Sequence, residues 1–286
     1  MDSTEAIFPP QWACPHCAHR PAWRDGIAQL APAGHDGARY DPSAYPLLAA
    51  AEDRHFWFAP RARLIAGLVD KFFPHARSAL EIGCGTGFVL AELARARPWR
   101  RIAGTDFHPE GLAIARSRVG SAAELLQADA CHAIATDAFD VIGLFDVIEH
   151  VPDDRAVLAL ARRTLTARGG IVLAVPQHPW LWSRADEAAG HVRRYRRGEL
   201  ELALVATRFR VLFSTSYVMT LLPVMAASRG LARRKPAAVR QHEDEFTPPR
   251  VINAILRAAL ELEVNLALRG IALPVGGSRI VVAEKQ

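Results

Sequence analysis

The feature that most constrains the fold is the stretch Ala79–Phe88, ALEIGCGTGF, in which an apolar run ends in Glu81 and three glycines follow at alternate positions. Glycine lets the backbone approach a ligand closely, because it has no Cβ and adopts positive φ without penalty. In the dinucleotide fingerprint the third glycine comes three residues after the second, and here that position is Phe88. The carboxylate of Glu81 would also repel a diphosphate. The stretch therefore predicts a nucleotide-type ligand that lacks a pyrophosphate.

Acidic residues end the next apolar segments as well. The segment 101–106 ends at Asp106, about twenty residues after the glycine turn, where a carboxylate can accept hydrogen bonds from ribose hydroxyls. The segment 124–129 ends at Asp129, and the long apolar segment 139–148 contains Asp146. Each acid alone has a second interpretation as a helix N-cap. Together they follow the rule that open α/β sheets bind ligands at the carboxyl ends of their strands.

Apolar segments and helix-length segments alternate along the rest of the chain. We expect further strands at 170–175, near 209–217 and near 278–283, and a helix whose first turn is capped by Asp153 and Asp154. This alternation predicts an α/β fold with a mostly parallel sheet that is covered by helices on both faces.

Two further motifs carry a resemblance to a known family. The glycine turn resembles the first motif of class I S-adenosylmethionine-dependent methyltransferases, and FDVIGLFDVIEHVPDD at 139–154 resembles the fourth-strand motif of the quinone-biosynthesis-like (type 11/23) enzymes. The string W-x3-D-x3-G-H-x-R-R-Y, from Trp182 to Tyr195, is similar to that of a related bacterial group. The resemblance covers roughly residues 10–286 and is most specific in the cofactor half.

The resemblance implies a doubly wound, Rossmann-like sheet of seven strands with a reversed last strand. It implies S-adenosyl-L-methionine as the cofactor, with Asp106 at the ribose and Asp129 at the adenine amino group, and methyl transfer to a small-molecule or lipid-linked acceptor, at oxygen or nitrogen. The residues expected to hold the cofactor are Glu81, Gly83, Cys84, Gly85, Gly87, Asp106, Phe107, Asp129, Ala130, Phe145 and Asp146.

A hydroxyl or protonated amine acceptor would need a positioned base to remove its proton. His191 and His150 are the candidates, because histidine accepts a proton near neutral pH. A structural hydrogen bond is the alternative for His191, and a helix-start position is the alternative for His150. Tyr195 is a third candidate, which would shape the acceptor pocket or contact the methyl donor.

The densest run of positive charge consists of Arg193, Arg194, Arg196 and Arg197. Guanidinium groups bind carboxylates and phosphates through paired hydrogen bonds, so this run raises the hypothesis of an anionic acceptor. A solvated basic loop is the alternative.

We expect three regions along the chain. Residues 1–40 form a small Cys/His/Pro-rich extension, 41–76 form a helical lid, and 77–286 form the methyltransferase domain, with a helical insertion at about 220–274. In the extension, Cys14 and Cys17 form a C-x-x-C turn of the kind that binds zinc, with His16 or His19 as substitute ligands. A closed zinc site needs four ligands and no second C-x-x-C follows, so we expect a degenerate knuckle without metal.

The insertion contains two apolar helical stretches, 218–227 and 251–273, that are interrupted by charged residues. This spacing is typical of amphipathic helices, which can cover the acceptor pocket, form a homodimer interface or lie on a membrane surface.

The composition excludes several other classes of protein. A net charge of +5 with no recognisable nucleic-acid-binding module gives no reason to expect a nucleic acid partner. Four cysteines in 286 residues make no disulfide framework, and MDSTEAIFPP lacks the features of a signal peptide, so we expect a cytoplasmic protein. Two functional alternatives stay open. One is a nucleotide-dependent oxidoreductase or epimerase, and the other is a non-catalytic S-adenosylmethionine-binding protein.

Overall fold

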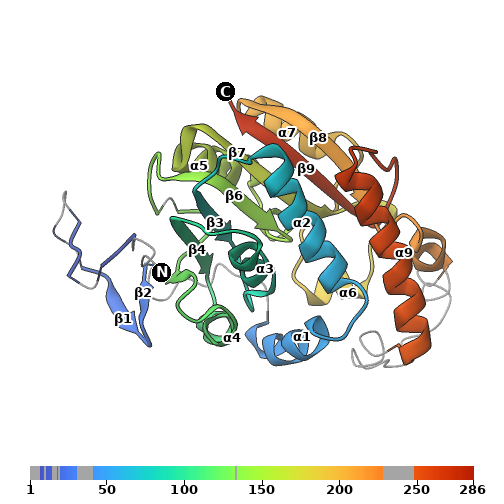
Figure 1. Ribbon diagram of the computed structural model, residues 1–286, viewed down its shortest axis with the longest axis horizontal. Coiled ribbons are helices and arrows are strands. Elements are labelled where there is room, and N and C mark those ends of the chain that lie inside the picture. The colour runs from blue at the N-terminus through green and yellow to red at the C-terminus, as the bar shows by residue number, and fades with distance from the viewer. Residues whose placement is uncertain are drawn as a thin grey trace.

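A central β-sheet organises the computed structural model, which describes residues 7–9, 11–14, 18, 20–30, 41–132, 134–227 and 248–286. Its nine strands lie in the order β1-β2-β5-β4-β3-β6-β7-β9-β8 (Figure 1). The strands that form the body of the sheet are β3 (Ser78–Ile82), β4 (Arg101–Asp106), β5 (Glu124–Gln127), β6 (Phe139–Phe145), β7 (Leu165–Pro176), β8 (Phe209–Tyr217) and β9 (Ser278–Lys285).

The body of the sheet confirms the predicted topology. Strands β3 to β7 pair in parallel, whereas β9 lies antiparallel between β7 and β8. The predicted fourth strand is shorter than expected, because Asp146 has a φ of 57° and the 3-10 helix η2 (Ile148–His150) follows it. This early end turns the chain towards the site described below.

The sheet has two more strands than the seven expected, and both come from the N-terminal extension. Strands β1 (Ala22–Arg24) and β2 (Ile27–Gln29) form a hairpin, and β2 pairs in parallel with β5. Asp25 and Gly26 connect them with φ values of 51° and 74°, the two positive angles that a tight hairpin turn requires. The division of residues 1–40 from the rest stays a prediction, and Cys17, His16 and His19 lie outside the described residues.

Helices cover both faces of the sheet. Successive residues of a strand point to opposite faces, so two neighbouring apolar residues pack against different helices. On β3, Ala79 packs with α2 (Phe58–Phe72), α3 (Phe88–Ala96), α4 (Pro109–Val119) and α9 (Arg250–Leu268). The next residue, Leu80, packs with α5 (Asp154–Thr164) and α7 (Glu199–Ala206). Helix α5 begins as predicted, since the Asp153 side chain accepts a hydrogen bond from the amide of Ala156.

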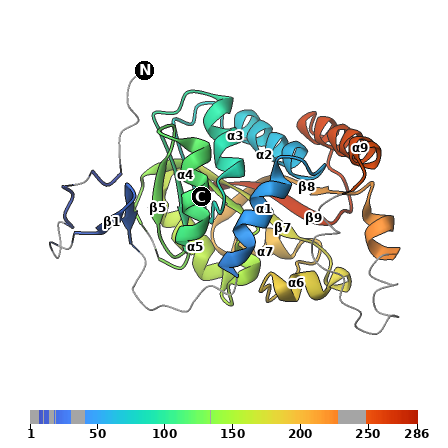
Figure 2. The same ribbon diagram turned by 90° about the horizontal axis from the view of Figure 1, so that it is seen from below.

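Two short helices lie at one end of the sheet. These are α1 (Tyr45–Glu52) and α6 (Arg184–Ala188), which lie in the lower part of Figure 1 and towards the viewer in Figure 2. The 3-10 helix η1 (Pro42–Ala44) precedes α1, and the 3-10 helix η3 (Pro179–Leu181) precedes α6. They lie beside the segments that follow β3, β4, β6 and β7. The carboxyl ends of the parallel strands therefore open towards α1 and α6.

The described residues of the predicted insertion are mostly helical. A short helix spans residues 222–227, and α9 packs along α2, where Leu268 leaves no space for a side chain on Gly67. One face of α9 is buried through Leu260, Val264 and Ala267. Residues 228–247, which hold most of the expected polar segment, lie outside the described residues. Among the described helices, none is long and apolar enough to cross a bilayer.

Candidate active site

A cavity of about 1020 Å³ lies at the carboxyl ends of the parallel strands. Every residue predicted to hold the cofactor lines it, with the exception of Gly87. Its opposite wall comes from the predicted lid, through α1 and the aromatic residues Phe56, Trp57 and Phe58, and from Val218, Leu221 and Met225 at the start of the insertion. The cavity thus has a polar floor and an apolar wall.

The glycine turn between β3 and α3 has a backbone that other residues cannot easily adopt. Gly83 has a φ of 73°, and a Cβ there would come within 2.5 Å of Val147 Cγ2. Gly87 has a φ of 74°, and a Cβ there would lie 2.8 Å from the Cβ of Ala115 on α4. Gly87 therefore serves the packing of the turn on α4, while Gly83 and Gly85 form the floor of the cavity.

Asp106 is held at the centre of this floor. Its Oδ2 accepts a hydrogen bond from the Gly85 amide at 2.8 Å, and its Oδ1 accepts from the His108 amide at 2.9 Å and from the Tyr45 hydroxyl at 3.2 Å. Burial raises the pKa of the Asp106 carboxyl, and the two amides partly offset this effect. The carboxylate is thus fixed by the turn that it follows and lies against helix α1.

Glu81 and Arg61 place opposite charges beside the turn. Glu81 is 3% exposed, its Oε2 has no hydrogen-bond partner among the described residues, and burial raises the pKa of its carboxyl well above the usual range. Arg61, from α2, forms a 2.7 Å ion pair with Asp146, stacks on Trp57 and leaves its Nε without a hydrogen-bond partner among the described residues. A buried polar atom without a partner is costly, so both groups suit a ligand that carries charge of both signs.

Sequence reasoning did not select Arg61, although a signal was present. Arg61 begins the stripe that continues with Leu64, Ile65 and Leu68, all of which are buried on one face of α2. An arginine in an apolar stripe must find a partner in the interior, and this one lies at the cavity.

The residues expected at the adenine combine a structural and a binding position. Asp129 and Ala130 line the cavity. At the same time, Oδ1 of Asp129 accepts from the Cys131 amide at 2.8 Å, and Oδ2 lies 3.3 Å from His132 Nδ1. No helix begins at Asp129 among the described residues, so its side chain holds a turn rather than a helix N-terminus, and its contact with the adenine stays a prediction.

His191 and His150 meet at the wall of the cavity, with ring centroids 4.7 Å apart and planes at 80°. His191 Nδ1 lies 3.0 Å from Asp186 Oδ1. Burial of Asp186 favours its neutral acid, but hydrogen bonds from His191 and Arg194 outweigh burial and lower the pKa of this carboxyl. Burial and the neighbouring charge of His191 lower the pKa of His150 to about 4. Of the two histidines, His191 is thus the one whose ring is oriented by a carboxylate.

Glu149 completes a cluster that sequence reasoning missed. Its carboxylate is fully buried, neither oxygen has a hydrogen-bond partner among the described residues, and burial followed by the charge of Asp146 raises its pKa well above the usual range. One ligand atom from each of Glu149, His150 and His191 lies within 4.8 Å of the others. One carboxylate and two imidazoles are a donor set that can hold a divalent cation. The adjacent residues Glu149 and His150 at the end of the fourth-strand motif were the sequence signal that could have indicated this cluster.

The expectation for Tyr195 was wrong, because its side chain lies in the core. Tyr195 is 1% exposed, does not line the cavity and donates a 2.8 Å hydrogen bond to Asp154 Oδ2. Burial raises the pKa of its hydroxyl above the usual range. The backbone of Tyr195 also forms a parallel β-bridge with Gln177. The β-bridge and the buried ring explain why the sequence has a tyrosine here without a contact with substrate.

Two of the four arginines in the basic run also have internal partners. Arg193 Nη1 lies 3.1 Å from Asp154 Oδ2, and Arg194 Nε lies 2.7 Å from Asp186 Oδ1. Arg194 also donates to the Gln177 carbonyl at 3.2 Å. These contacts hold the loop after β7 in place, and Arg194 also lines the cavity, so recognition of an anionic acceptor by the basic run stays a prediction.

The strand order, the glycine turn and the acids at the strand ends define the fold of class I S-adenosylmethionine-dependent methyltransferases. Residues 80–173 match a family model described as "Methyltransferase domain". Residues 80–173 therefore form a methyltransferase domain, and the fold and the relatives support its assignment to class I S-adenosylmethionine-dependent enzymes.

Individual relatives agree with this assignment. The chain is 31% identical over 124 residues to a ubiquinone biosynthesis O-methyltransferase of Sodalis glossinidius, covering 41% of this chain and 49% of the relative. It is 32% identical over 109 residues to the enzyme of the same description from Thiobacillus denitrificans, covering 36% and 46%. The chain thus spans about half the length of the curated relatives that it matches.

A solved structure supports the fold over a longer range. The complex between the Haloferax volcanii Trm112 methyltransferase activator and a methyltransferase contains a chain that aligns with a TM-score of 0.57 at 16% identity. The alignment covers 85% of this chain and 94% of that chain. At this identity the likeness concerns the fold alone.

Proposed function

We propose that this protein binds S-adenosyl-L-methionine in the cavity and catalyses transfer of its methyl group to a hydroxyl of a small-molecule acceptor. The observation that carries the proposal is the position of His191, which is paired with Asp186, on the same cavity as the glycine turn and Asp106. The relatives described as O-methyltransferases favour oxygen over nitrogen as the acceptor atom.

The residues of the cavity fit the cofactor on both sides of its charge. The buried Oε2 of Glu81, which has no hydrogen-bond partner among the described residues, would accept from the amino group of the cofactor. The Nε of Arg61 would donate to the carboxylate of the cofactor. Asp106 would accept from the ribose hydroxyls, and the amide and side chain around Asp129 and Ala130 would meet the adenine. When bound, the cofactor supplies a methyl group that is already activated by its sulfonium.

The protein's own residues would orient the acceptor and remove its proton. His191 accepts the proton of the acceptor hydroxyl, and Asp186 stabilises the imidazolium that results. Holding the hydroxyl oxygen in line with the methyl group supplies much of the remaining rate, because proximity and orientation replace a bimolecular encounter. The apolar wall of Phe56, Trp57 and Met225 excludes water and favours an acceptor with a ring or hydrocarbon portion.

Calorimetric titration with S-adenosylhomocysteine and with NAD tests the cofactor. Binding of the first and not the second is expected, whereas binding of NAD alone would identify a nucleotide-dependent oxidoreductase or epimerase. A mass-spectrometric screen of cell extracts for a gain of one methyl group then tests turnover. Cofactor binding without any methylated product would point to a non-catalytic binding protein. Repeating the assay after dialysis against EDTA separates the base from a metal at Glu149, His150 and His191.

The proposal extends to an acceptor that is attached to a lipid. The outward face of α9 exposes Val251, Ile255 and Leu262, and Arg250 and Arg257 are exposed on the same helix. Asn253 Oδ1 accepts from the Phe56 amide at 2.8 Å, so this end of α9 adjoins the lid residues at the cavity. Such a face fits peripheral contact with an anionic membrane surface.

Three measurements test this extension, together with the proposed cytoplasmic location. Flotation with anionic liposomes should carry the protein upwards, and I255E should abolish the effect. A homodimer in light scattering that I255E dissociates, with no flotation, would assign the same face to a second copy of the chain instead. Recovery in a cytosolic or peripherally bound fraction of fractionated cells is expected, and recovery outside the cytoplasm would contradict the location.

A further inference from the structure

Helix α1 is joined to the cofactor turn by polar contacts rather than by an apolar face. It has eight residues, and only Tyr45, Ala51 and Glu52 are buried. Isolated helices shorter than about 12 to 15 residues are marginal in water, so α1 depends on contacts with its neighbours. Tyr45 reaches Asp106, and Glu52 reaches the glycine turn at the other end of the helix.

Glu52 and Thr86 form the second of these contacts. The Thr86 hydroxyl lies 2.8 Å and 2.7 Å from the two carboxylate oxygens of Glu52 and donates its proton to that carboxylate. Thr86 is 2% exposed and stands between Gly85 and Gly87 in the turn. Burial raises the pKa of Glu52, and the contacts from Thr86 and Arg118 oppose this effect. These two contacts therefore favour the ionised carboxylate of Glu52 against burial.

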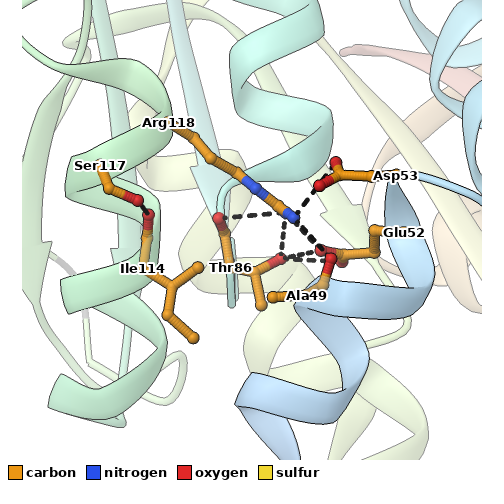
Figure 3. Close-up of polar contacts among 7 residues, drawn as sticks. All are labelled: Ala49, Glu52, Asp53, Thr86, Ile114, Ser117 and Arg118. Atoms are coloured by element: carbon orange, nitrogen blue, oxygen red, sulfur yellow. Dashed lines mark hydrogen bonds and ion pairs between the residues drawn. The ribbon is translucent and has the colours of Figure 1, made fainter.

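Arg118, near the end of α4, supplies the cation (Figure 3). Its Nη1 forms a hydrogen-bonded ion pair with Glu52 and donates to the Thr86 hydroxyl at 2.9 Å. Its Nη2 donates to the Ala49 carbonyl at 3.0 Å and lies 3.6 Å from Asp53 Oδ1. The side chains of Arg118 and Glu52 are only 16% and 7% exposed.

The contact with Ala49 gives Arg118 a second effect on α1. The last four carbonyls of a helix have no partner within the helix, and a cation at that end is favourable. Ala49 belongs to this last turn. One guanidinium thus satisfies the end of α1, neutralises Glu52 and bonds the turn, which a single planar group with several N–H donors can do.

We propose that Arg118 is a positioning residue for cofactor binding, which latches helix α1 over the glycine turn through Glu52 and Thr86. We call Arg118, Glu52 and Thr86 the latch. The latch and the Tyr45–Asp106 hydrogen bond span the two ends of α1, so α1 can move away from the turn only when both break. Because α1 lines the cavity through Tyr45, Leu48 and Glu52, its closure retains the bound cofactor. This inference rests on the proposed function.

The test measures dissociation of S-adenosylhomocysteine from the full chain by stopped flow. R118A should increase the dissociation rate about tenfold, the effect of losing one hydrogen-bonded charge contact. R95A is the matched control, since Arg95 is an exposed helical arginine that bonds Glu92 and the Ala91 carbonyl of its own helix. E52Q should also increase the dissociation rate. In the double variant R118A/E52Q the two effects should add to less than their sum in free energy, because both variants remove the same contact.

Hydrogen exchange separates this proposal from the proposed function. In the free protein, R118A should speed amide exchange over residues 45–52 while R95A leaves it unchanged. If the wild-type protein does not bind S-adenosylhomocysteine, the proposed function is wrong. The hydrogen-exchange comparison of R118A with wild type still tests the latch in that case. Wild-type dissociation and exchange rates in R118A would overturn the latch. If R118A does not fold, both the dissociation rate and the exchange rate are measured in E52Q. Wild-type rates in E52Q would then overturn the latch.

Discussion

His191 Nδ1 lies 3.0 Å from Oδ1 of Asp186, an aspartate whose side chain is 1% exposed. The same carboxylate accepts hydrogen bonds from Arg194 Nε at 2.7 Å and from the Ser183 amide at 2.8 Å. Asp186 therefore orients the ring of His191 and holds the loop after β7 in one conformation. A base that is oriented by a carboxylate is a recurring arrangement in proton-transfer catalysis.

We predict that D186N lowers kcat by about 100-fold and changes the KM for S-adenosylmethionine little. An amide can keep the hydrogen bonds that cap α6, but it cannot stabilise a protonated His191, and positioned bases contribute about 100-fold or more. Steady-state kinetics with the acceptor found by the extract screen checks this. E187Q is the control, because Glu187 is the next residue of α6 and its side chain accepts an exposed hydrogen bond from Trp182 Nε1. Equal kcat values in D186N and wild type would remove His191 as the base.

Glu81 makes cofactor binding depend on pH in one direction. Burial raises the pKa of its carboxyl in the free protein, so this carboxyl keeps its proton at a pH where an exposed glutamate has lost it. A ligand amino group that carries positive charge favours the ionised carboxylate and lowers this pKa. We therefore predict that the affinity for S-adenosylhomocysteine increases as the pH rises towards the raised pKa of Glu81 and is constant above it.

Titration calorimetry in buffers of different ionisation enthalpy measures the same effect as release of a proton on binding. In E81Q the release should disappear and the affinity should depend less on pH, since glutamine has no proton to lose. E92Q, on the solvent side of α3, should behave as wild type. Proton uptake on binding by the wild-type protein would contradict this prediction.

Local sequence patterns predicted the parts of the site that depend on backbone chemistry. Gly83, Asp106 and Asp129 were found because a turn with positive φ and a strand-end carboxylate each demand a particular residue type. The body of the sheet was predictable for a similar reason, since most of its strands are followed by a helix that buries one face.

The parts that were missed depend on which distant segments meet. Arg61, Glu149 and the latch pair residues that lie between about 30 and 90 positions apart, and no local spacing encodes such a contact. Tyr195 was misjudged because its neighbours in sequence are polar, while its ring turns inward to Asp154. The β1–β2 hairpin joined the sheet through β5, a pairing that local composition did not reveal.

The turn geometry predicts that G83A is far more harmful than another alanine at the same φ. Gly83 and Gly26 have φ values of 73° and 74°, but a Cβ at Gly83 meets Val147, whereas a Cβ at Gly26 has no atom within 4 Å. G26A should lose about 1 kcal/mol of the free energy of unfolding, from its backbone alone. G83A should lose more and should also weaken S-adenosylhomocysteine binding. Denaturant unfolding and calorimetry check the two variants, and equal losses in both would show that Val147 gives way.

The buried position of Tyr195 predicts that its hydroxyl serves stability and not catalysis. Y195F keeps the ring and removes the 2.8 Å hydrogen bond to Asp154, which keeps its contact with Arg193 at 3.1 Å. The free energy of unfolding should fall by about 1 kcal/mol, the usual effect of one lost hydrogen bond, while kcat and both KM values stay at wild-type levels. Denaturant unfolding and steady-state kinetics, with H191Q measured beside it as a variant of the proposed base, check the result. A kcat for Y195F as low as that of H191Q would place the hydroxyl at the reacting atoms after all.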